Sequence, residues 1–399
     1  MVNVVVVGTG IYVCGRGTDT YGTVLPALFE AHKMSLGKDI HVVGRSNESL
    51  KSFSEKEKAL KRIMGVSPHV SLHLQEKEGE AALLEILRKI PRPVVAIVVV
   101  PDHVHFEVVS SVIEKGMHVL VVKPLAQTVK EVECLISMQE EAGIYGAVEF
   151  HKRFDRSNLK MKEIVDSGKI GTPLYSVVEY SQKKIIPEEI FAKWSSKTNV
   201  FSYLGVHYVD MIYFVTRAEP VRVAATGQKK WLRAKGIDTY DSIQAMVEWE
   251  LPENKGRMTS IFLTNWIDPN CMSAMSDQKI KIIGTKGRYE ADQKHRGIQV
   301  ITDENGIMDI NPDFSEFYLD PDGKTMSFKG YGPESIIQFI KDARAIESGE
   351  ISWRQLAGMR PTFREALVST QVIEAVSLSL KREGAWVNTS SIHKERQRE

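Results

Sequence analysis

Short apolar segments alternate with longer amphipathic segments over the first 150 residues of the chain. Four segments that are apolar on both faces predict strands, at residues 4–7, 40–43, 94–100 and 118–122. Helical spacing of apolar positions predicts helices over residues 25–32, 49–62, 81–89, 104–115 and 129–142. Strands that are apolar on both faces are typical of a parallel sheet covered by helices. The alternation therefore predicts a doubly wound α/β domain of the Rossmann type, which binds ligands beyond the carboxyl ends of its strands.

After residue 150 the predicted strands follow one another directly, at residues 174–181, 221–228, 242–251, 257–266, 279–283 and 298–302. This order predicts a second, α+β domain with a large and mainly antiparallel sheet. We therefore expect a Rossmann dinucleotide-binding domain over residues 1–150 and a substrate-binding and oligomerisation domain over residues 151–389. Residues 390–399 are dense in charge and poor in apolar side chains, which predicts a flexible tail.

The predicted strand over residues 257–266 and its continuation offer apolar side chains to both faces of the second sheet. On one face lie Met258, Phe262 and Trp266, and on the other lie Ile261, Leu263 and Ile267. One face can cover the helices of its own domain, whereas the other needs another cover. A second copy of the chain is the simplest cover, so we expect a homodimer or homotetramer formed through this sheet.

Composition narrows the classes of partner. The chain has 399 residues, and 52 Lys and Arg against 51 Asp and Glu give a net charge of +1, which predicts no binding to nucleic acid. The longest apolar run, 94–100, is too short to span a membrane, and the first residues form a strand rather than a secretion signal. The three cysteines are far apart and predict neither disulfides nor a metal site. We expect a cytoplasmic protein with a small-molecule partner.

The first predicted strand leads into Gly8-Thr9-Gly10. Glycine at this turn allows backbone amides to approach a pyrophosphate, and the next helix adds its positive end. Gly8, Thr9 and Gly10 are therefore candidate cofactor-binding residues, although an ordinary tight turn is the alternative because Val13 stands where a third glycine would. The purpose of the long segment 15–22 stays open.

The end of the second predicted strand indicates which nucleotide binds. An NAD site places an acidic residue there to accept from the ribose 2′-hydroxyl, whereas this chain has Arg45 and Ser46. Arginine and serine suit a 2′-phosphate and favour NADP over NAD. A solvent-facing arginine without a ligand is the alternative.

Several separated motifs carry a family resemblance. They are Val-Val-Val-Pro-Asp-His-Val-His at 98–105, Glu-Lys-Gly-Met-His-Val-Leu-Val-Val-Lys-Pro-Leu at 114–125, Phe-His-Lys-Arg-Phe-Asp at 150–155, Asp-Ser-Gly-Lys-Ile-Gly at 166–171, Leu-Gly-Val-His-Tyr-Val-Asp at 204–210 and Gly-Thr-Lys-Gly at 284–287. In this order they resemble the glucose-fructose oxidoreductase, inositol dehydrogenase and rhizopine catabolism family of NAD(P)-dependent oxidoreductases. The resemblance extends over nearly the whole chain.

The resemblance implies a catalytic lysine at Lys123, beside the nicotinamide and the reacting carbon. A lysine there can bind the substrate oxygen and stabilise the charge that develops on it. Val122 departs from the family pattern, which has an acid before the lysine. The resemblance also places Pro101 and His105 in a turn on the cofactor side.

The second catalytic element implied by the resemblance is His207, which exchanges a proton with the substrate hydroxyl. Tyr203 stands where the family has an acid, four residues earlier, and we expect it to assist the transfer from the same helical face. Asp210 matches the last acid and has a supporting role in substrate binding. Arg153 is a candidate substrate-binding residue, whereas we interpret Lys152 as solvated.

Together these observations predict an NADP- or NAD-dependent oxidoreductase. It would move a hydride between nicotinamide and a secondary alcohol or ketone carbon of a sugar, cyclitol or sugar nucleotide. One alternative keeps the fold and a tightly held cofactor for glycoside cleavage or for oxidising one sugar while reducing another. A second alternative, favoured by Val122 and Tyr203 at positions where the family has acids, is a dinucleotide-sensing regulator without catalysis.

Overall fold

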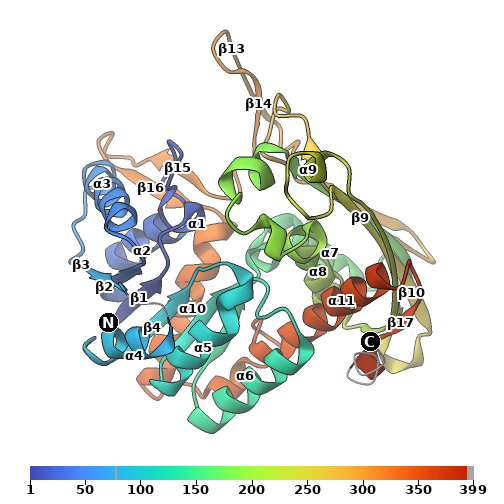
Figure 1. The fold of residues 1–399 in the computed structure, drawn as a ribbon, viewed down its shortest axis with the longest axis horizontal. Coiled ribbons are helices and arrows are strands. Elements are labelled where there is room, and N and C mark those ends of the chain that lie inside the picture. Colours follow the sequence, from blue (N-terminus) through green and yellow to red (C-terminus); the bar gives the residue numbers. More distant parts are fainter. Residues whose placement is uncertain (77–78, 393–399) are drawn as a thin grey trace. The chain divides into compact units, whose positions relative to one another are not determined.

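The computed structural model describes residues 1–76 and 79–392, and its contacts divide the chain into two compact units (Figure 1). The first unit contains Met1–Ala126, Glu131–Phe154 and Asp313–Ala366. The second contains Gln127–Lys130, Asp155–Pro312 and the chain from Leu367 onward. The predicted tail lies outside the described residues from position 393 onward. The chain thus crosses between the units close to residue 150 and later returns to the first.

A six-stranded parallel sheet forms the centre of the first unit, in the order β3-β2-β1-β4-β5-β6. Its strands are β1 (Val2–Val7), β2 (Gly37–Gly44), β3 (Val70–Leu74), β4 (Val94–Val98), β5 (His118–Val122) and β6 (Gly146–Glu149). Strand order reverses between β1 and β4, the place where doubly wound sheets bind nucleotides. The predicted Rossmann fold is confirmed.

Helices cover this sheet because its strands are apolar on both faces. The helices are α1 (Ile11–Cys14), α2 (Val24–Lys33), α3 (Asn47–Met64), α4 (Glu80–Arg88), α5 (His105–Glu114) and α6 (Val129–Ala142). Short turns η1 (Asp102–Val104) and η2 (His151–Phe154) follow β4 and β6. Val4 and Val6 join one apolar core with α2, α3 and a later helix, α10, whereas Val5 between them points to the opposite face.

Residues 313–366 return to the first unit and complete that core. They form the hairpin β15 (Glu316–Leu319) and β16 (Met326–Lys329), helix α10 (Tyr331–Glu347) and turn η7 (Trp353–Leu356). Phe328, Phe339 and Leu356 pack with the core of α2 and α3.

The second unit is built on a seven-stranded sheet in the order β12-β11-β7-β10-β9-β8-β17. Its strands are β7 (Pro173–Lys183), β8 (Glu219–Gln228), β9 (Ser242–Glu250), β10 (Arg257–Asp268), β11 (Ser276–Gly284), β12 (Arg288–Asp292) and β17 (Val387–Asn388). All neighbours are antiparallel except β10 and β7, which run parallel. Residues 298–302, predicted as a strand of this sheet, instead form a separate hairpin, β13 (Ile298–Thr302) with β14 (Gly306–Ile310), which projects from the unit (Figure 1).

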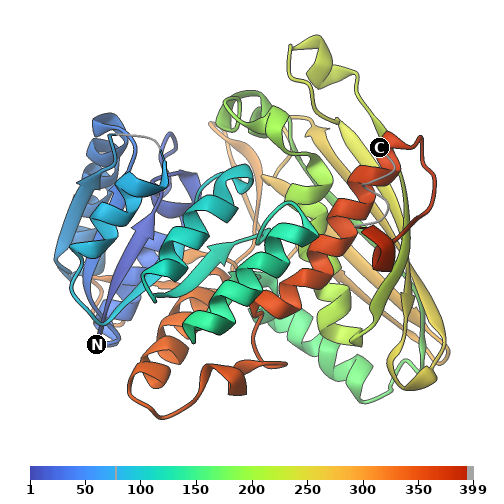
Figure 2. The same ribbon diagram turned by 60° about the horizontal axis from the view of Figure 1, so that its bottom comes forward.

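Helices lie against one face of the second sheet, visible in Figure 2. They are α7 (Arg156–Asp166), α8 (Val206–Thr216) and α11 (Phe363–Lys381), whereas the short α9 (Trp231–Ala234) lies in the connection between β8 and β9. Two π-helical turns, η3 (Ile186–Ile190) and η5 (Phe201–Gly205), precede α8, and the remaining turns are η4 (Ser195–Lys197), η6 (Pro252–Asn254) and η8 (Thr389–Ser391). Met258, Phe262 and Trp266 are buried on the helix side.

Candidate active site

The glycine turn after β1 has the backbone that nucleotide binding requires. Gly8 has φ +119°, and a Cβ there would lie 2.0 Å from the carbonyl oxygen of Val99, so only glycine fits. A Cβ at Gly10 would meet no atom within 4 Å, which leaves this side of the turn open. The turn therefore suits close approach of a diphosphate to the amides that begin α1.

Arg16, in the segment 15–22, places a cation at the glycine turn. Nη1 of Arg16 lies 3.4 Å from Oγ1 of Thr9 and donates to it. Nζ of Lys56, on α3, donates to the carbonyl oxygens of Thr18 and Thr20 at 2.7 and 2.8 Å and fixes the segment against the helix. The sequence analysis did not identify Arg16, because no spacing rule relates it to the turn.

Arg45 and Ser46 lie at the carboxyl end of β2, and both are exposed. The Oγ atom of Ser46 accepts from the backbone amide of Ser49 at 3.1 Å and caps the first turn of α3. This helix start contributes a positive dipole end where a nucleotide ribose or its phosphate would bind. Residues 45 and 46 thus fit the predicted cofactor site.

Lys123 follows β5 and is 8% exposed. Burial lowers the pKa of its amine to about 7, against the opposing effect of the Asp102 and Glu149 carboxylates. Lysines with a pKa near neutrality are concentrated at functional sites, because an isolated structural lysine has no reason to be buried. The predicted catalytic lysine is therefore a buried amine with a lowered pKa.

Pro101 and His105 follow β4. Nε2 of His105 lies 2.9 Å from the Val100 carbonyl oxygen and Nδ1 lies 2.7 Å from the Pro124 carbonyl oxygen. Burial lowers the pKa of the His105 imidazole. His105 therefore links the turn after β4 to the turn that carries Lys123, and its contact with a cofactor stays a prediction.

The second unit places Tyr203 and His207 at the junction of η5 and α8. His207 and Asp210 are buried in α8, and the His207 ring lies 6.1 Å from the Tyr180 ring. Because η5 is a π-helical turn, Tyr203 and His207 are not related by the ordinary α-helical repeat that the sequence analysis assumed. Such turns are frequent at functional sites, since they redirect one side chain.

An aromatic cluster surrounds Tyr203. Its ring lies 5.0 Å from that of Phe191, 5.9 Å from that of Trp194 and 5.6 Å from that of Trp266. Phe191 and Trp266 are buried, so this cluster fixes the position of the Tyr203 ring before α8. The sequence analysis did not foresee this cluster, because its members are up to 75 positions apart in the chain.

The turn η2 after β6 is buried. Arg153 forms an ion pair with Glu365 and lies beside the Phe150 ring within the first unit, and its substrate contact stays a prediction. Lys152 is 1% exposed, so its interpretation as a solvated residue is wrong. The compact η2 turn directs this side chain inward together with its neighbours.

Within residues 1–76 and 79–392, no helix combines the length and apolar character needed to cross a membrane. The same residues contain no group of three or more His, Cys, Asp or Glu side chains arranged to hold a metal ion.

A Rossmann unit with a glycine turn and a buried strand-end lysine, in one chain with a mixed-sheet unit that carries a buried histidine, defines a nicotinamide-dependent oxidoreductase with two domains. The sequence profile of the oxidoreductase family with an NAD-binding Rossmann fold matches residues 2–150. The profile of the GFO/IDH/MocA C-terminal domain matches residues 158–290. The chain therefore belongs to the glucose-fructose oxidoreductase, inositol dehydrogenase and rhizopine catabolism family, and it is an NAD(P)-dependent dehydrogenase of that family.

Curated relatives include two inositol dehydrogenases. A myo-inositol 2-dehydrogenase of Thermotoga maritima is 25% identical over 253 residues, which cover 62% of this chain and 69% of that protein. A scyllo-inositol 2-dehydrogenase (NAD+) of Bacillus subtilis is 24% identical over 220 residues, 55% of this chain and 61%, less than two thirds, of that protein.

Solved structures share the fold over nearly all of the chain. A scyllo-inositol dehydrogenase of Lactobacillus casei with bound NAD(H) and scyllo-inositol has a TM-score of 0.67 at 18% identity, covering 98% of this chain and 100% of that one. An aldose-aldose oxidoreductase of Caulobacter crescentus has a TM-score of 0.66 at 18% identity, covering 97% and 99%.

Proposed function

We propose that the chain oxidises a secondary alcohol of a cyclitol, or of a sugar with similar ring hydroxyls, to a ketone. The observation that carries this proposal is Lys123, a buried amine with a pKa of about 7 at the carboxyl end of β5, in the same parallel sheet as the strand that precedes the glycine turn. The names of the inositol dehydrogenase relatives support a cyclitol as substrate.

In the proposed mechanism Lys123 donates a hydrogen bond to the hydroxyl oxygen of the substrate and stabilises the negative charge that develops on it. His207 accepts the hydroxyl proton on a ring nitrogen. Tyr203 and its aromatic neighbours orient the ring of the substrate, and Asp210 supports His207. Bound NAD(P)+ supplies the hydride acceptor at the nicotinamide C4 atom.

The cofactor would be held by Gly8, Thr9 and Gly10 at the diphosphate, with Arg16 as an added cation. We propose NADP as the preferred form, because Arg45 follows β2 where NAD sites have an acid. Replacing Arg45 by alanine should raise the dissociation constant for NADPH about tenfold and leave that for NADH within about twofold. An equal rise in the dissociation constants for NADPH and NADH would contradict the proposed preference for NADP.

We also propose self-association through the outward face of the second sheet. In-register neighbours place Met246, Ile261 and Val177 in one row across β9, β10 and β7 on this face. Leu263, two residues after Ile261, is 38% exposed. A row of apolar side chains on an open sheet face favours a second copy as its cover.

The function is tested with purified protein, NAD+ and NADP+ in turn, and a panel of inositols, aldoses and sugar nucleotides, with nicotinamide reduction followed by absorbance. Reduction with at least one inositol, lost in Lys123→Ala while cofactor affinity stays within a few fold, is the expected result. Background rates over the whole panel would overturn the proposal. In that case nicotinamide released from the denatured protein would indicate the tightly held cofactor of the alternative activity.

A further inference from the structure

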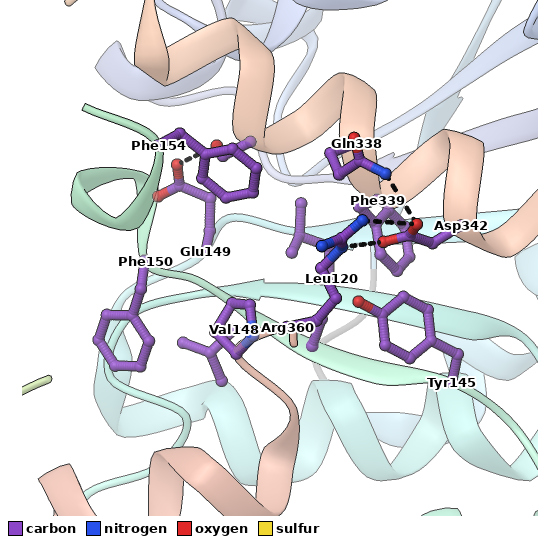
Figure 3. Close-up of a pocket in the computed structure, with 13 residues that line it drawn as sticks. Leu120, Tyr145, Val148, Glu149, Phe150, Phe154, Gln338, Phe339, Asp342 and Arg360 are labelled. Carbon is purple, nitrogen blue, oxygen red and sulfur yellow. Dashed lines mark hydrogen bonds and ion pairs between the residues drawn. The ribbon is translucent and has the colours of Figure 1, made fainter. Parts of the chain in front are cut away.

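Glu149, the last residue of β6, carries a buried carboxylate that is surrounded by donors. Its side chain is 1% exposed. The Oε1 atom accepts from the Tyr12 hydroxyl at 2.9 Å and from the Ser335 hydroxyl at 2.8 Å. The Oε2 atom lies 3.0 Å from Nδ1 of His151. Figure 3 shows this carboxylate at the edge of a small cavity, with its bond to the serine drawn as a dashed line.

The strand register places Glu149 at the same end of the sheet as Lys123, and its charge acts on the amine. Val122, the last residue of β5, pairs in parallel with Glu149, and Lys123 is the next residue along. Adjacent strands lie about 4.8 Å apart, so the two groups belong to the same end of the sheet. Asp102 follows β4, the neighbour of β5 on its other side. The lysine is thus acted on by one carboxylate from the turn after β4 and by one from the end of β6.

We propose that Glu149 is a positioning residue for Lys123: its carboxylate supplies the negative charge that keeps the buried amine protonated and directs it at the end of β5. This inference rests on the proposed catalytic use of Lys123 and adds a residue that acts on that lysine rather than on substrate or cofactor. Val122 of β5 carries no charge, and in this proposal the charge comes instead from Glu149, the residue of β6 that is in register with it.

Donors from three elements surround the Glu149 carboxylate. Burial, with the Glu149 charge next in size, raises the pKa of the Tyr12 hydroxyl well above its usual range, so that this group stays a donor. Tyr12 belongs to α1, directly after the glycine turn, and Ser335 belongs to α10. With His151 of η2, three donors from three elements therefore converge on one carboxylate.

The charged groups that face Lys123 and Glu149 come from a small set of elements. Asp102 and Glu149 act on the lysine from η1 and β6. His151 faces the carboxylate from η2, and Tyr331 of α10 acts on the Tyr12 hydroxyl. Removing the Glu149 charge leaves Asp102 as the remaining carboxylate acting on the lysine, so the amine should lose its proton at lower pH.

A purely structural role makes a different prediction. If Glu149 only joins α1, α10 and η2, then its replacement should lower stability and leave the titration of Lys123 unchanged. Glu149→Gln removes the charge and retains an oxygen that can accept from Tyr12 and Ser335. Ser335→Ala is the matched control, because it removes one donor to the same oxygen and changes no charge.

The titration of Lys123 can be measured without substrate. The full-length protein is labelled with a trace of acetic anhydride over a range of pH, and acetylation of the peptide that carries Lys123 is quantified by mass spectrometry. We expect the labelling midpoint to fall by about one pH unit in Glu149→Gln and to move by less than about a third of a unit in Ser335→Ala. An unchanged midpoint in a folded Glu149→Gln variant would overturn the inference.

A second variant tests whether the charge, rather than the side chain at position 149, acts on the lysine. Val122→Glu combined with Glu149→Gln moves the carboxylate to the in-register position on β5, and we expect it to restore the midpoint to within about half a unit of wild type. A midpoint in this double variant that is lower than wild type by a full unit contradicts the inference. Because no substrate is used, failure of the proposed reaction would leave the measurement valid.

Kinetics provide an independent readout once a substrate is known. Since the charged amine is the active form, kcat/KM should fall above the lysine midpoint, and this alkaline limb should move to lower pH in Glu149→Gln. In Ser335→Ala the alkaline limb of kcat/KM should stay at the pH of the wild type. A limb that does not move, together with lower activity at every pH, would indicate a structural role alone.

Discussion

Replacing Lys123 by methionine should remove a large pH-dependent contribution to stability. Burial lowers the pKa of this amine from its usual 10.5 to about 7. The folded protein therefore loses the proton at lower pH than the unfolded chain does. Methionine has a similar length and no ionisable group, so the variant lacks this titration.

The sign follows from the proton balance. Between about pH 7 and pH 10 the unfolded chain holds one more proton than the folded protein, so the free energy of unfolding of the wild type rises with pH. The slope is at most about 1.4 kcal/mol per pH unit. Below about pH 7 the amine is protonated in both the folded and the unfolded chain. Burial of the charged amine then lowers the free energy of unfolding by up to about 5 kcal/mol. The variant avoids this cost, although the two carboxylates then lose the opposite charge of the amine, which offsets part of its gain in stability.

The assay is urea unfolding followed by tryptophan fluorescence at about pH 7, 8 and 9. We expect the stability of the variant relative to the wild type to fall by roughly 2 kcal/mol or more across this range. Lys58→Met, which changes an exposed lysine on α3 of the same unit, is the control and should keep the wild-type slope. Parallel curves for Lys123→Met and the wild type would refute the reasoning.

Three further predictions concern the turn, the buried ion pair and the sheet face. Gly8→Ala should lower the free energy of unfolding by at least about 2 kcal/mol in urea, because its Cβ would meet a backbone oxygen at 2.0 Å, whereas Gly10→Ala should fold normally. Arg153→Leu should cost about 3–5 kcal/mol by leaving Glu365 buried without its arginine, and the double leucine variant should recover most of it in the same assay. Leu263→Lys should convert an oligomer into monomers in light scattering; a wild-type monomer at micromolar concentration would contradict this prediction.

The fold was predictable where apolar patterning is strong, and the exceptions have physical causes. Residues 70–74 form an edge strand with the alternating sequence Val-Ser-Leu-His-Leu, and residues 146–149 form a strand of Gly-Ala-Val-Glu, which is poor in β-branched side chains. Neither has the continuous apolar character by which the other parallel strands were recognised. Residues 298–302 do have a strand pattern, but pattern alone does not show which strand becomes its partner.

The candidate site was predictable in its strand-end residues and not in the contacts between them. Gly8, Arg45 and Lys123 each directly follow or end a parallel strand, and the topology alone brings such positions to one edge. The bond between Tyr12 and Glu149 spans 137 positions and depends on side-chain directions that no periodicity encodes. Motif matching therefore identifies the lysine and does not identify the group that acts on it.

Lys123 lowers the stability of the fold, and the groups that offset this loss lie on other elements than the lysine. An amine with a lowered pKa destabilises the fold at neutral pH, and a lysine on the surface would not. The sheet tolerates the amine because the turn η1 after β4 and the end of β6 each supply a carboxylate that acts on it, while the apolar core of α2, α3 and α10 lies against other parts of the same sheet. The pKa of the lysine therefore falls no further than about 7, and part of the amine stays charged at neutral pH. If the carboxylates were absent, burial alone would leave a neutral amine, which stabilises developing negative charge less well.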